Sequence, residues 1–489
     1  MMRRLLIAVS AAMLLGSVTD GVMAGKPWDN GRLNVSENGE YLMFSNGQPF
    51  FWTGNTAWFL PQRLNRDEAA FFLSRCASAG YNVVQIQVLN DMPSHNVYGQ
   101  MSSDEAFDLS NVEKPGVYGY WDHVDYIIET AAKHGIYVGM VCVWGSMVKD
   151  GRMDVQKAKT YGTFLANRYK NKKNIVWIMG GDIQGSIHTE VWDTLANTIK
   201  SIDKEHLMTF HPRGRHTSAS WFNDRDWLDF NMFQSGHRRY WQRMGNKDYP
   251  ITEGTEEDNW MYVDSTRKYK PTKPVLDGEP SYEDIPQGLH FADEPLWTAA
   301  DVRRYAYWAV FAGACGHTYG HNAIMQFVKP GIGGAYFADG TKKPWYAALD
   351  DPGFNQMVFL KELILTFPYF VRKADQSVIH NNGTQYDRLI ATRGNDYLLV
   401  YNYTGREMTV DLQAIEGKEK NVWWMSPTDG ALTYLGKFDS KQTTFRYHPT
   451  DRTDTDGVLI IVDSNKDYIA IDQQNIIKQS AQTKKDLTE

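Results

Sequence analysis

Two acidic residues stand at the ends of apolar runs that are typical of buried strands. Glu279 follows the short run 274–276 and lies between Gly278 and Pro280. Asp182 ends a second run, Asn-Ile-Val-Trp-Ile-Met-Gly-Gly-Asp. Gly278 permits a sharp backbone turn, and Pro280 prevents a helix from starting at once. Two carboxyl groups on rigid strand ends can hydrolyse a glycosidic bond: one protonates the leaving oxygen, and the other attacks the anomeric carbon or activates a water molecule.

Alternating strand and helix patterns position these acids within residues 50–368. Strands of a parallel sheet are buried on both faces, so their sequences are continuously apolar instead of alternating. Eight such runs, most followed by helical spacing, predict an α/β fold, a parallel (β/α)8 or TIM barrel. The predicted strands are 50–54, 82–89, 136–144, 175–179, 207–211, 228–233, 274–276 and 316–320. The predicted helices are 67–79, 120–134, 155–169, 189–202, 255–269, 298–312 and 354–365.

The segments outside the barrel differ in character. Residues 1–24 have a basic start, a short apolar run and small residues at a cleavage site, which predicts a secretory signal peptide. Residues 25–49 form an N-terminal extension with a hairpin pattern. Short β-rich runs separated by Gly, Asn and Asp turns predict a small antiparallel β-sandwich over 369–465. Residues 466–489 are a polar tail.

The composition and the predicted signal peptide limit the classes of partner and the cellular location of the protein. A net charge of −7 argues against nucleic acid as the main partner. No cysteine lies near the cleavage site and no second long apolar run follows, so we expect a periplasmic or secreted protein whose mature form does not associate with membranes. The 16 tryptophans and 27 tyrosines fit core packing, and they also suit the flat faces that line sugar-binding clefts.

In a (β/α)8 barrel the chemistry lies at the carboxyl ends of the strands. Asp182 and Glu279 fall on strands four and seven, where a large group of retaining glycosidases carries its acid/base and its nucleophile. We therefore predict Asp182 as the acid/base and Glu279 as the nucleophile. The other strand-end side chains are predicted to bind substrate: Asn55, Trp58, Gln87, Asn90, Trp144, His211, Arg213, Gln234, His237 and Tyr319.

The acid on strand four departs from the usual pattern. Those glycosidases carry Asn-Glu there, whereas this chain has Gly-Gly-Asp. A shorter acid needs a backbone closer to the sugar, which paired glycines permit. Asp277 is expected to support the turn on strand seven. Other acids stay open as partners although none stands at a strand end: Glu253, Glu256, Glu257, Glu283 and Asp284.

Two further groups of residues have more than one interpretation. His317, Tyr319 and His321 alternate on strand eight, so they could point to one face. A metal site would also need carboxylates that converge with them, so core or substrate contacts are the preferred interpretation, and the reaction needs no cofactor. The basic segments 211–216 and 237–243 are either solvated loops or contacts for an anionic substrate such as a uronic-acid polymer. Three cysteines fit no zinc spacing and are interpreted as buried thiols, with one oxidised pair as the alternative: Cys76, Cys142 and Cys315.

The motifs, taken in order, resemble the apiosidase-like glycoside hydrolases, exported proteins of polysaccharide-degrading Bacteroidetes. They are the sequences Phe-Trp-Thr-Gly-Asn-Thr-Ala-Trp at 51–58, Met-Gly-Gly-Asp at 179–182, Val-Leu-Asp-Gly-Glu-Pro-Ser at 275–281 and Gly-His-Thr-Tyr-Gly at 316–320. The resemblance implies the barrel, a C-terminal β-sandwich sometimes labelled collagen-binding, and the stated roles of Asp182 and Glu279.

The same resemblance implies a substrate. We expect a retaining endo-apiosidase that acts on the side chains of rhamnogalacturonan II, a pectin of plant cell walls with a galacturonate backbone. One alternative is another endo-glycosidase of the glucanase or arabinan type. A second alternative is a secreted carbohydrate-binding protein without turnover, but a binding protein does not need both Asp182 and Glu279.

Overall fold

The protein is described here by a computed structural model. The described residues are 25–242, 256–289, 293–331, 343–439, 441–446 and 455–469. The predicted signal peptide, Glu253 and most of the polar tail lie outside them. Within these ranges, no helix combines the length and the apolar character that crossing a membrane requires.

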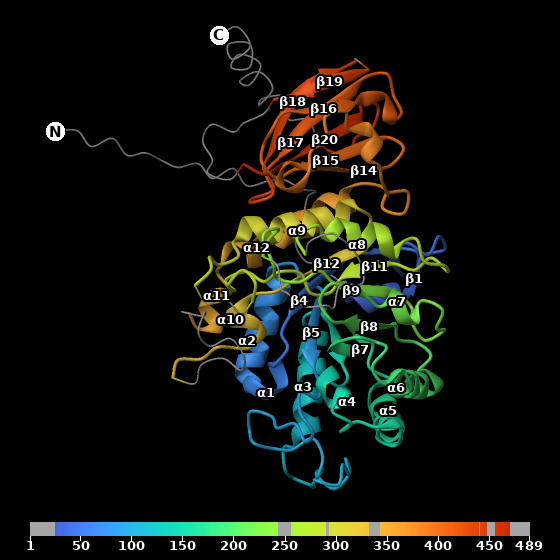
Figure 1. The fold of residues 1–489 in the computed structure, drawn as a ribbon, viewed down its shortest axis with the longest axis vertical. Coiled ribbons are helices and arrows are strands. Elements are labelled where there is room, and N and C mark those ends of the chain that lie inside the picture. Colours follow the sequence, from blue (N-terminus) through green and yellow to red (C-terminus); the bar gives the residue numbers. More distant parts are fainter. Residues whose placement is uncertain are drawn as a thin grey trace, which may run out of the picture.

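Among the residues that the structure describes, eight parallel strands form a barrel in the larger part of the molecule (Figure 1). Their hydrogen-bonded order is β8-β7-β6-β5-β4-β12-β11-β10, and the short β9 pairs antiparallel with β10. Between β8 and β10, the backbone N–H of Asp229 donates to the carbonyl of Met208 at 2.8 Å. The strands are β4 (Trp52–Thr56), β5 (Val83–Gln87), β6 (Tyr137–Val141), β7 (Ile175–Ile183), β8 (Met208–Pro212), β9 (His216–Thr217), β10 (Asn231–Gln234), β11 (Val275–Asp277) and β12 (Gly316–Tyr319).

Helices surround the barrel and begin at the residues that cap them. The side chain of Asn65 accepts from the N–H of Glu68, and the side chain of Glu68 accepts from Asn65, so both ends of this capping box satisfy free N–H groups. The longer helices are α2 (Arg66–Ser78), α3 (Tyr120–Lys133), α5 (Val155–Tyr169), α6 (Thr189–Ile202), α8 (Asn259–Thr266), α9 (Ala299–Phe311) and α12 (Pro352–Thr366). The short ones are α1 (Leu60–Arg63), α4 (Gly145–Lys149), α7 (Ala219–Phe222), α10 (Asn322–Met325) and α11 (Trp345–Ala348).

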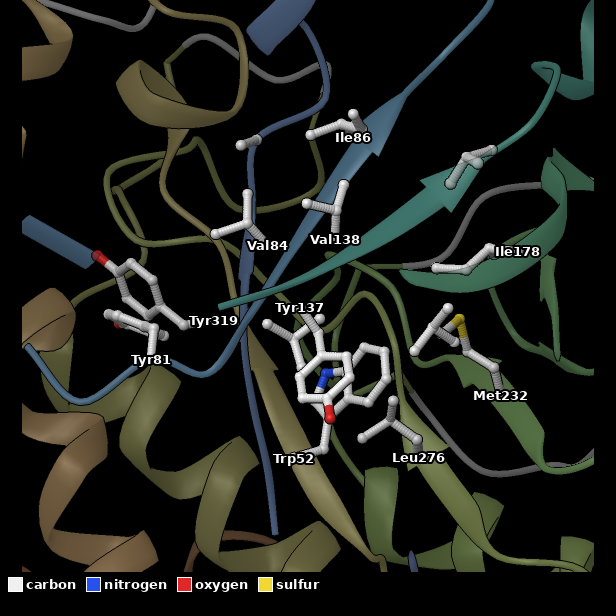
Figure 2. Close-up of a cluster of buried hydrophobic side chains, with 14 of the residues drawn as sticks. Trp52, Tyr81, Val84, Ile86, Tyr137, Val138, Ile178, Met232, Leu276 and Tyr319 are labelled. Atoms are coloured by element: carbon white, nitrogen blue, oxygen red, sulfur yellow. The ribbon is translucent and has the colours of Figure 1, made fainter. Parts of the chain in front are cut away.

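Large side chains fill the barrel. Figure 2 shows Trp52, Met232 and Leu276 among this buried cluster. The indole N–H of Trp52 donates to Thr318 Oγ1 at 3.1 Å, and a β-carbon at Gly316 would lie 2.2 Å from the Trp52 carbonyl oxygen. A side chain at position 316 would therefore collide with Trp52, so glycine is required there. A packed interior leaves the strand ends as the place for a site.

The C-terminal part has two antiparallel sheets, in the orders β13-β14-β15-β20-β17-β18 and β16-β19. Side chains alternate across a strand, so Leu398 and Val400 face the smaller sheet, whereas Leu399 and Tyr401 pack against the barrel core. The barrel and this β-sandwich confirm the predicted fold class. The strands are β13 (Lys373–Ala374), β14 (Leu389–Arg393), β15 (Tyr397–Asn402), β16 (Met408–Asp411), β17 (Lys420–Met425), β18 (Leu432–Phe438), β19 (Gln442–Phe445) and β20 (Gly457–Asp463).

The N-terminal extension and the domain interface complete the fold. The expected hairpin is β1 (Leu33–Val35) with β2 (Leu42–Phe44), and β3 (Pro49–Phe50) adds a third short strand. The sandwich lies on the side of the barrel that α9 and α12 form (Figure 1). There the fully buried guanidinium of Arg303 donates to both carboxylate oxygens of Asp456, at 3.0 and 2.8 Å.

Candidate active site

A cavity of about 280 Å³ opens at the carboxyl ends of the barrel strands. Both predicted catalytic acids, Asp182 and Glu279, line it. The predicted binding residues that line it are Trp58, Gln87, Trp144, Arg213, Gln234 and His237. The remaining lining residues are Phe59, Gly214, Arg215, Gly236, Arg238, Glu256, Tyr282, Leu289 and Met325.

The end of β7 bulges toward this cavity. Gly180, Gly181 and Asp182 all have positive φ, of 85°, 108° and 52°, and the ladder to β8 shifts its register between Gly180 and Ile183. A β-carbon would lie 2.3 Å from the His211 carbonyl at Gly180 and 2.6 Å from the Trp144 ring at Gly181. Only glycines fit this path, which brings the short side chain of Asp182 to the cavity. A left-handed aspartate is itself uncommon and is typical of functional sites.

Asp182 is the exposed residue of an otherwise buried strand, and it lines the cavity. The residues around the cavity desolvate its carboxyl group. This desolvation, with the negative charge of Glu279 as the second cause, raises the pKa of Asp182 to about 6 against the opposing charges of His211 and Arg213. Asp182 is thus protonated in mildly acidic solution and can act as a general acid there.

Glu279, just after β11, lies between two imidazoles. Its Oε2 is 3.2 Å from His211 Nε2, and its Oε1 is 3.3 Å from His237 Nε2. The N–H of Asp182 donates to His211 Nδ1 at 3.4 Å, and Nε2 of the same ring faces Glu279. Burial alone would raise the pKa of Glu279, but the contacts and charges of the two imidazoles outweigh it and lower the pKa to about 2. Between about pH 2 and pH 6, Glu279 is therefore ionised while Asp182 is protonated.

Tyr282 is a site residue for which the sequence analysis assigned no role. Its hydroxyl accepts from Trp58 Nε1 at 3.1 Å, and burial followed by the charge of Glu279 raises its pKa well above the usual value. The hydroxyl stays protonated and can donate toward the carboxylate. Its position three residues after Glu279, in the same strand-end segment, was the available signal. Trp58 also packs edge to face on Trp144, with ring centroids 5.4 Å apart.

Glu256 joins the basic residues of the cavity. Its Oε1 accepts from Arg215 at 3.0 Å and from Arg238 at 2.6 Å, and its Oε2 accepts from the N–H of His237 at 2.5 Å. These contacts fix the segment after β10 and offset part of the positive charge of the two predicted basic segments. Arg213 lines the cavity beside Asp182, whose pKa it lowers.

The other acids considered as partners hold structural positions. Glu257 pairs with Arg304 Nη2 at 2.8 Å. Glu283 accepts from the hydroxyl of Tyr319 at 2.5 Å. Asp277 accepts from Ser235 Oγ and Asn259 Nδ2, at 2.9 and 3.0 Å, and burial raises its pKa to about 7. None of these acids lines the cavity, and neither does Asp284.

Several predicted binding residues lie away from the cavity. Asn55 is fully buried and pairs in register with Tyr319, which contacts Tyr81 with ring centroids 6.1 Å apart (Figure 2). The side chain of Asn90 accepts from Ser94 Oγ at 2.9 Å. His211 is also fully buried, but it reaches the site through Glu279.

The remaining titratable candidates are buried. Burial lowers the pKa of His317 to about 3, and His321 Nε2 is 2.8 Å from Asp351. Among the residues that the structure describes, no group of three or more His, Cys, Asp or Glu is placed to hold a metal ion. The three cysteines are buried and unpaired, which confirms their interpretation as buried thiols: Cys76, Cys142 and Cys315.

Comparisons with known proteins find similarity to glycoside hydrolases. The family model described as "Apiosidase-like, catalytic domain" matches residues 36–371, and "Putative collagen-binding domain of a collagenase" matches residues 374–462. A solved structure named "Glycoside hydrolase" is 61% identical with a TM-score of 0.88, over 91% of this chain and 100% of that chain. A glycoside hydrolase family 5 structure from Bacteroides vulgatus is also 61% identical, with a TM-score of 0.88, over 91% of this chain and 96% of that chain. No curated protein matches the sequence.

Proposed function

The chain belongs to the apiosidase-like family of glycoside hydrolases, and we propose that it is a retaining enzyme with Glu279 as nucleophile and Asp182 as acid/base. The observation that carries the proposal is that two carboxyl groups in one cavity have pKa values shifted in opposite directions. The pKa of Asp182 is raised to about 6, while that of Glu279 is lowered to about 2. A pair separated in this way provides one acid and one carboxylate over the same range of pH.

The first step forms a covalent intermediate. The Glu279 carboxylate attacks the anomeric carbon, and the bond from that carbon to the leaving oxygen breaks while Asp182 gives the oxygen its proton. Esterified Glu279 has no negative charge, and this charge is the second cause of the raised pKa of Asp182. The pKa of Asp182 therefore falls in the intermediate, as its role in the next step requires.

The second step restores the enzyme. Ionised Asp182 takes a proton from a water molecule, whose oxygen attacks the anomeric carbon and releases the Glu279 carboxylate. Two displacements on opposite faces retain the configuration of the sugar. His211 and His237 keep Glu279 ionised and oriented, whereas the Trp58 and Trp144 rings offer apolar faces to a sugar. Neither step requires a cofactor.

For the substrate, we propose apiose-linked side chains of rhamnogalacturonan II, cleaved internally by an enzyme exported to the periplasm or the medium. The apiosidase-like catalytic model over residues 36–371 supports the sugar. Arg213 in the cavity supports the galacturonate backbone, because a guanidinium pairs well with a carboxylate. The predicted signal peptide supports export to the periplasm or the medium, where such polymers are found.

The test is product release from purified rhamnogalacturonan II, with neutral glucans and arabinans in parallel and Glu279→Ala as control. Apiose-terminated oligosaccharides that appear only with the wild-type enzyme would support both the substrate and the nucleophile. Release from a glucan or an arabinan alone would retain the two acids but reject the pectin. Binding to a polymer without any turnover would favour the non-catalytic binding protein.

A further inference from the structure

The β-sandwich contacts the segment that carries His237. Tyr386, in the one-turn helix Gln385–Asp387 of the sandwich, donates its hydroxyl hydrogen to the Glu257 carboxylate, whose two oxygens are both 2.9 Å away. The same hydroxyl oxygen accepts from Arg239 Nη1 at 3.1 Å. Arg239 also pairs with Glu257 at 3.2 Å and with Asp301 at 3.0 Å. Tyr386 thus connects the sandwich directly to Arg239, two residues after His237.

Arg239 in turn packs on Trp297, which binds the backbone of His237. Its guanidinium lies 4.2 Å from the centroid of the Trp297 ring, within the range of a cation–π interaction. The indole N–H of Trp297 donates to the His237 carbonyl at 3.2 Å, and the N–H of Gly288 donates to the same oxygen at 2.6 Å. The backbone of His237 is therefore fixed from the side of the sandwich, while its ring stays 3.3 Å from Glu279.

We propose that the C-terminal β-sandwich is a working part of the active site: Tyr386 is a positioning residue that, through Arg239 and Trp297, holds His237 against Glu279. This role differs from binding of a second ligand by the sandwich and from general stabilisation of the barrel. The kinetic part of this inference rests on the proposed function. The position of the His237 segment can be observed without substrate and does not depend on it.

The chain offers a matched control at the same interface. The hydroxyl of Tyr401 donates to Asp456 at 2.9 Å, and Asp456 pairs with Arg303 on α9. Both Tyr386 and Tyr401 thus bond a carboxylate in the region where the sandwich meets the barrel, but the bonds of Tyr401 lead to α9 rather than to His237. Tyr→Phe at either position removes one hydroxyl and keeps the ring.

The experiment compares Tyr386→Phe, Tyr401→Phe and the wild-type full chain by hydrogen exchange of peptides covering 231–242 and by the pH profile of kcat/KM. We expect faster exchange in this segment for Tyr386→Phe alone. We also expect kcat to fall about tenfold with little change in KM, since small displacements near reacting atoms are costly. The acid limb of the profile should move to higher pH, because a looser His237 stabilises ionised Glu279 less.

Two results would overturn the proposal. One is unchanged exchange and an unchanged acid limb in Tyr386→Phe. The other is an equal loss in both variants, which would mean that the interface only stabilises the barrel. If the wild-type enzyme releases nothing from rhamnogalacturonan II, the substrate proposal fails, but the exchange comparison still decides whether Tyr386 holds the segment.

A second variant tests the path through Trp297. Trp297→Phe keeps an aromatic face under Arg239 but removes the N–H that binds the His237 carbonyl. We expect it to shift the acid limb in the same direction as Tyr386→Phe. A Trp297→Phe enzyme with a wild-type profile would show that Tyr386 does not act through this tryptophan.

Discussion

The pH dependence of kcat/KM gives the sharpest test of the two acids, because their pKa values are separated in one cavity. In the proposed mechanism, activity requires ionised Glu279, with a pKa of about 2, and protonated Asp182, with a pKa of about 6. The profile should be flat between these values. Above pH 6 it should fall, to about one tenth at pH 7 and about one hundredth at pH 8, as the protonated fraction of Asp182 decreases.

The assay measures kcat/KM at each pH on two substrates. One is the polysaccharide fragment, whose leaving oxygen needs a proton. The other is an aryl glycoside of the same sugar with an acidic phenol, which leaves without protonation. On the aryl glycoside, Asp182→Ala should retain much of the rate of the first step and should lose the basic limb, because the group that titrates there is gone.

Two outcomes would refute this reasoning. The first is a basic limb that persists in Asp182→Ala on the aryl glycoside, since another group would then be the acid. The second is activity on the polysaccharide that rises into alkaline solution, which no protonated carboxylic acid with a pKa near 6 can support.

Three further predictions concern stability and geometry. Asp182→Asn should raise Tm at pH 7, by a margin that shrinks toward pH 4. The pKa of Asp182 is higher in the folded than in the unfolded protein, so the wild type loses stability as the pH rises above the pKa of the unfolded state. A Tm difference independent of pH would contradict this. Gly181→Ala should lower kcat about a hundredfold by displacing Asp182, because its β-carbon would lie 2.6 Å from Trp144; a wild-type kcat would show that the bulge is not required. Arg303→Met should reduce the free energy of unfolding by about 3–5 kcal/mol, since it leaves the buried Asp456 carboxylate without its cationic partner; an unchanged urea midpoint would exclude this.

Much of the fold follows from the sequence because the barrel strands are continuous apolar runs and the long helices have capped, periodic patterns. The predicted helices 155–169 and 189–202 coincide with α5 and α6. Elements of only a few residues, such as β9 and α10, have too few positions to show a period, and they were not predicted. The edge strand β18, Leu432–Phe438, was also missed, because its side chains are partly exposed and it lacks an apolar run.

The site was predictable where a strand-end residue faces the barrel axis. Gln87 and Gln234 line the cavity, as does Asp182 after its bulge. Asn55 does not, because side chains alternate along a strand: a β-carbon at Gly54 would meet the Trp52 indole inside the barrel, so Asn55 faces the other way. Packing decides which residues of a short strand face the barrel interior, and the sequence pattern does not reveal this choice.

The loop contacts depend on the folded chain in a different way. Tyr282 approaches Glu279 only after the chain turns at Gly278 and Pro280. The bonds of Glu256 to Arg215 and Arg238 join residues 41 and 18 positions apart, so no local spacing predicts them. The positive charges that the sequence suggested as an anion site are therefore offset in part by Glu256, which binds one arginine from each basic segment.

Azide rescue tests the central claim, the separate roles of Glu279 and Asp182, most directly. With an aryl glycoside and sodium azide, Glu279→Ala should regain turnover and give a glycosyl azide of inverted configuration, because azide attacks from the vacated face. Asp182→Ala should give the azide of retained configuration, because azide attacks the Glu279-linked intermediate. The same anomer from both variants, or rescue with the two configurations exchanged, would contradict the account.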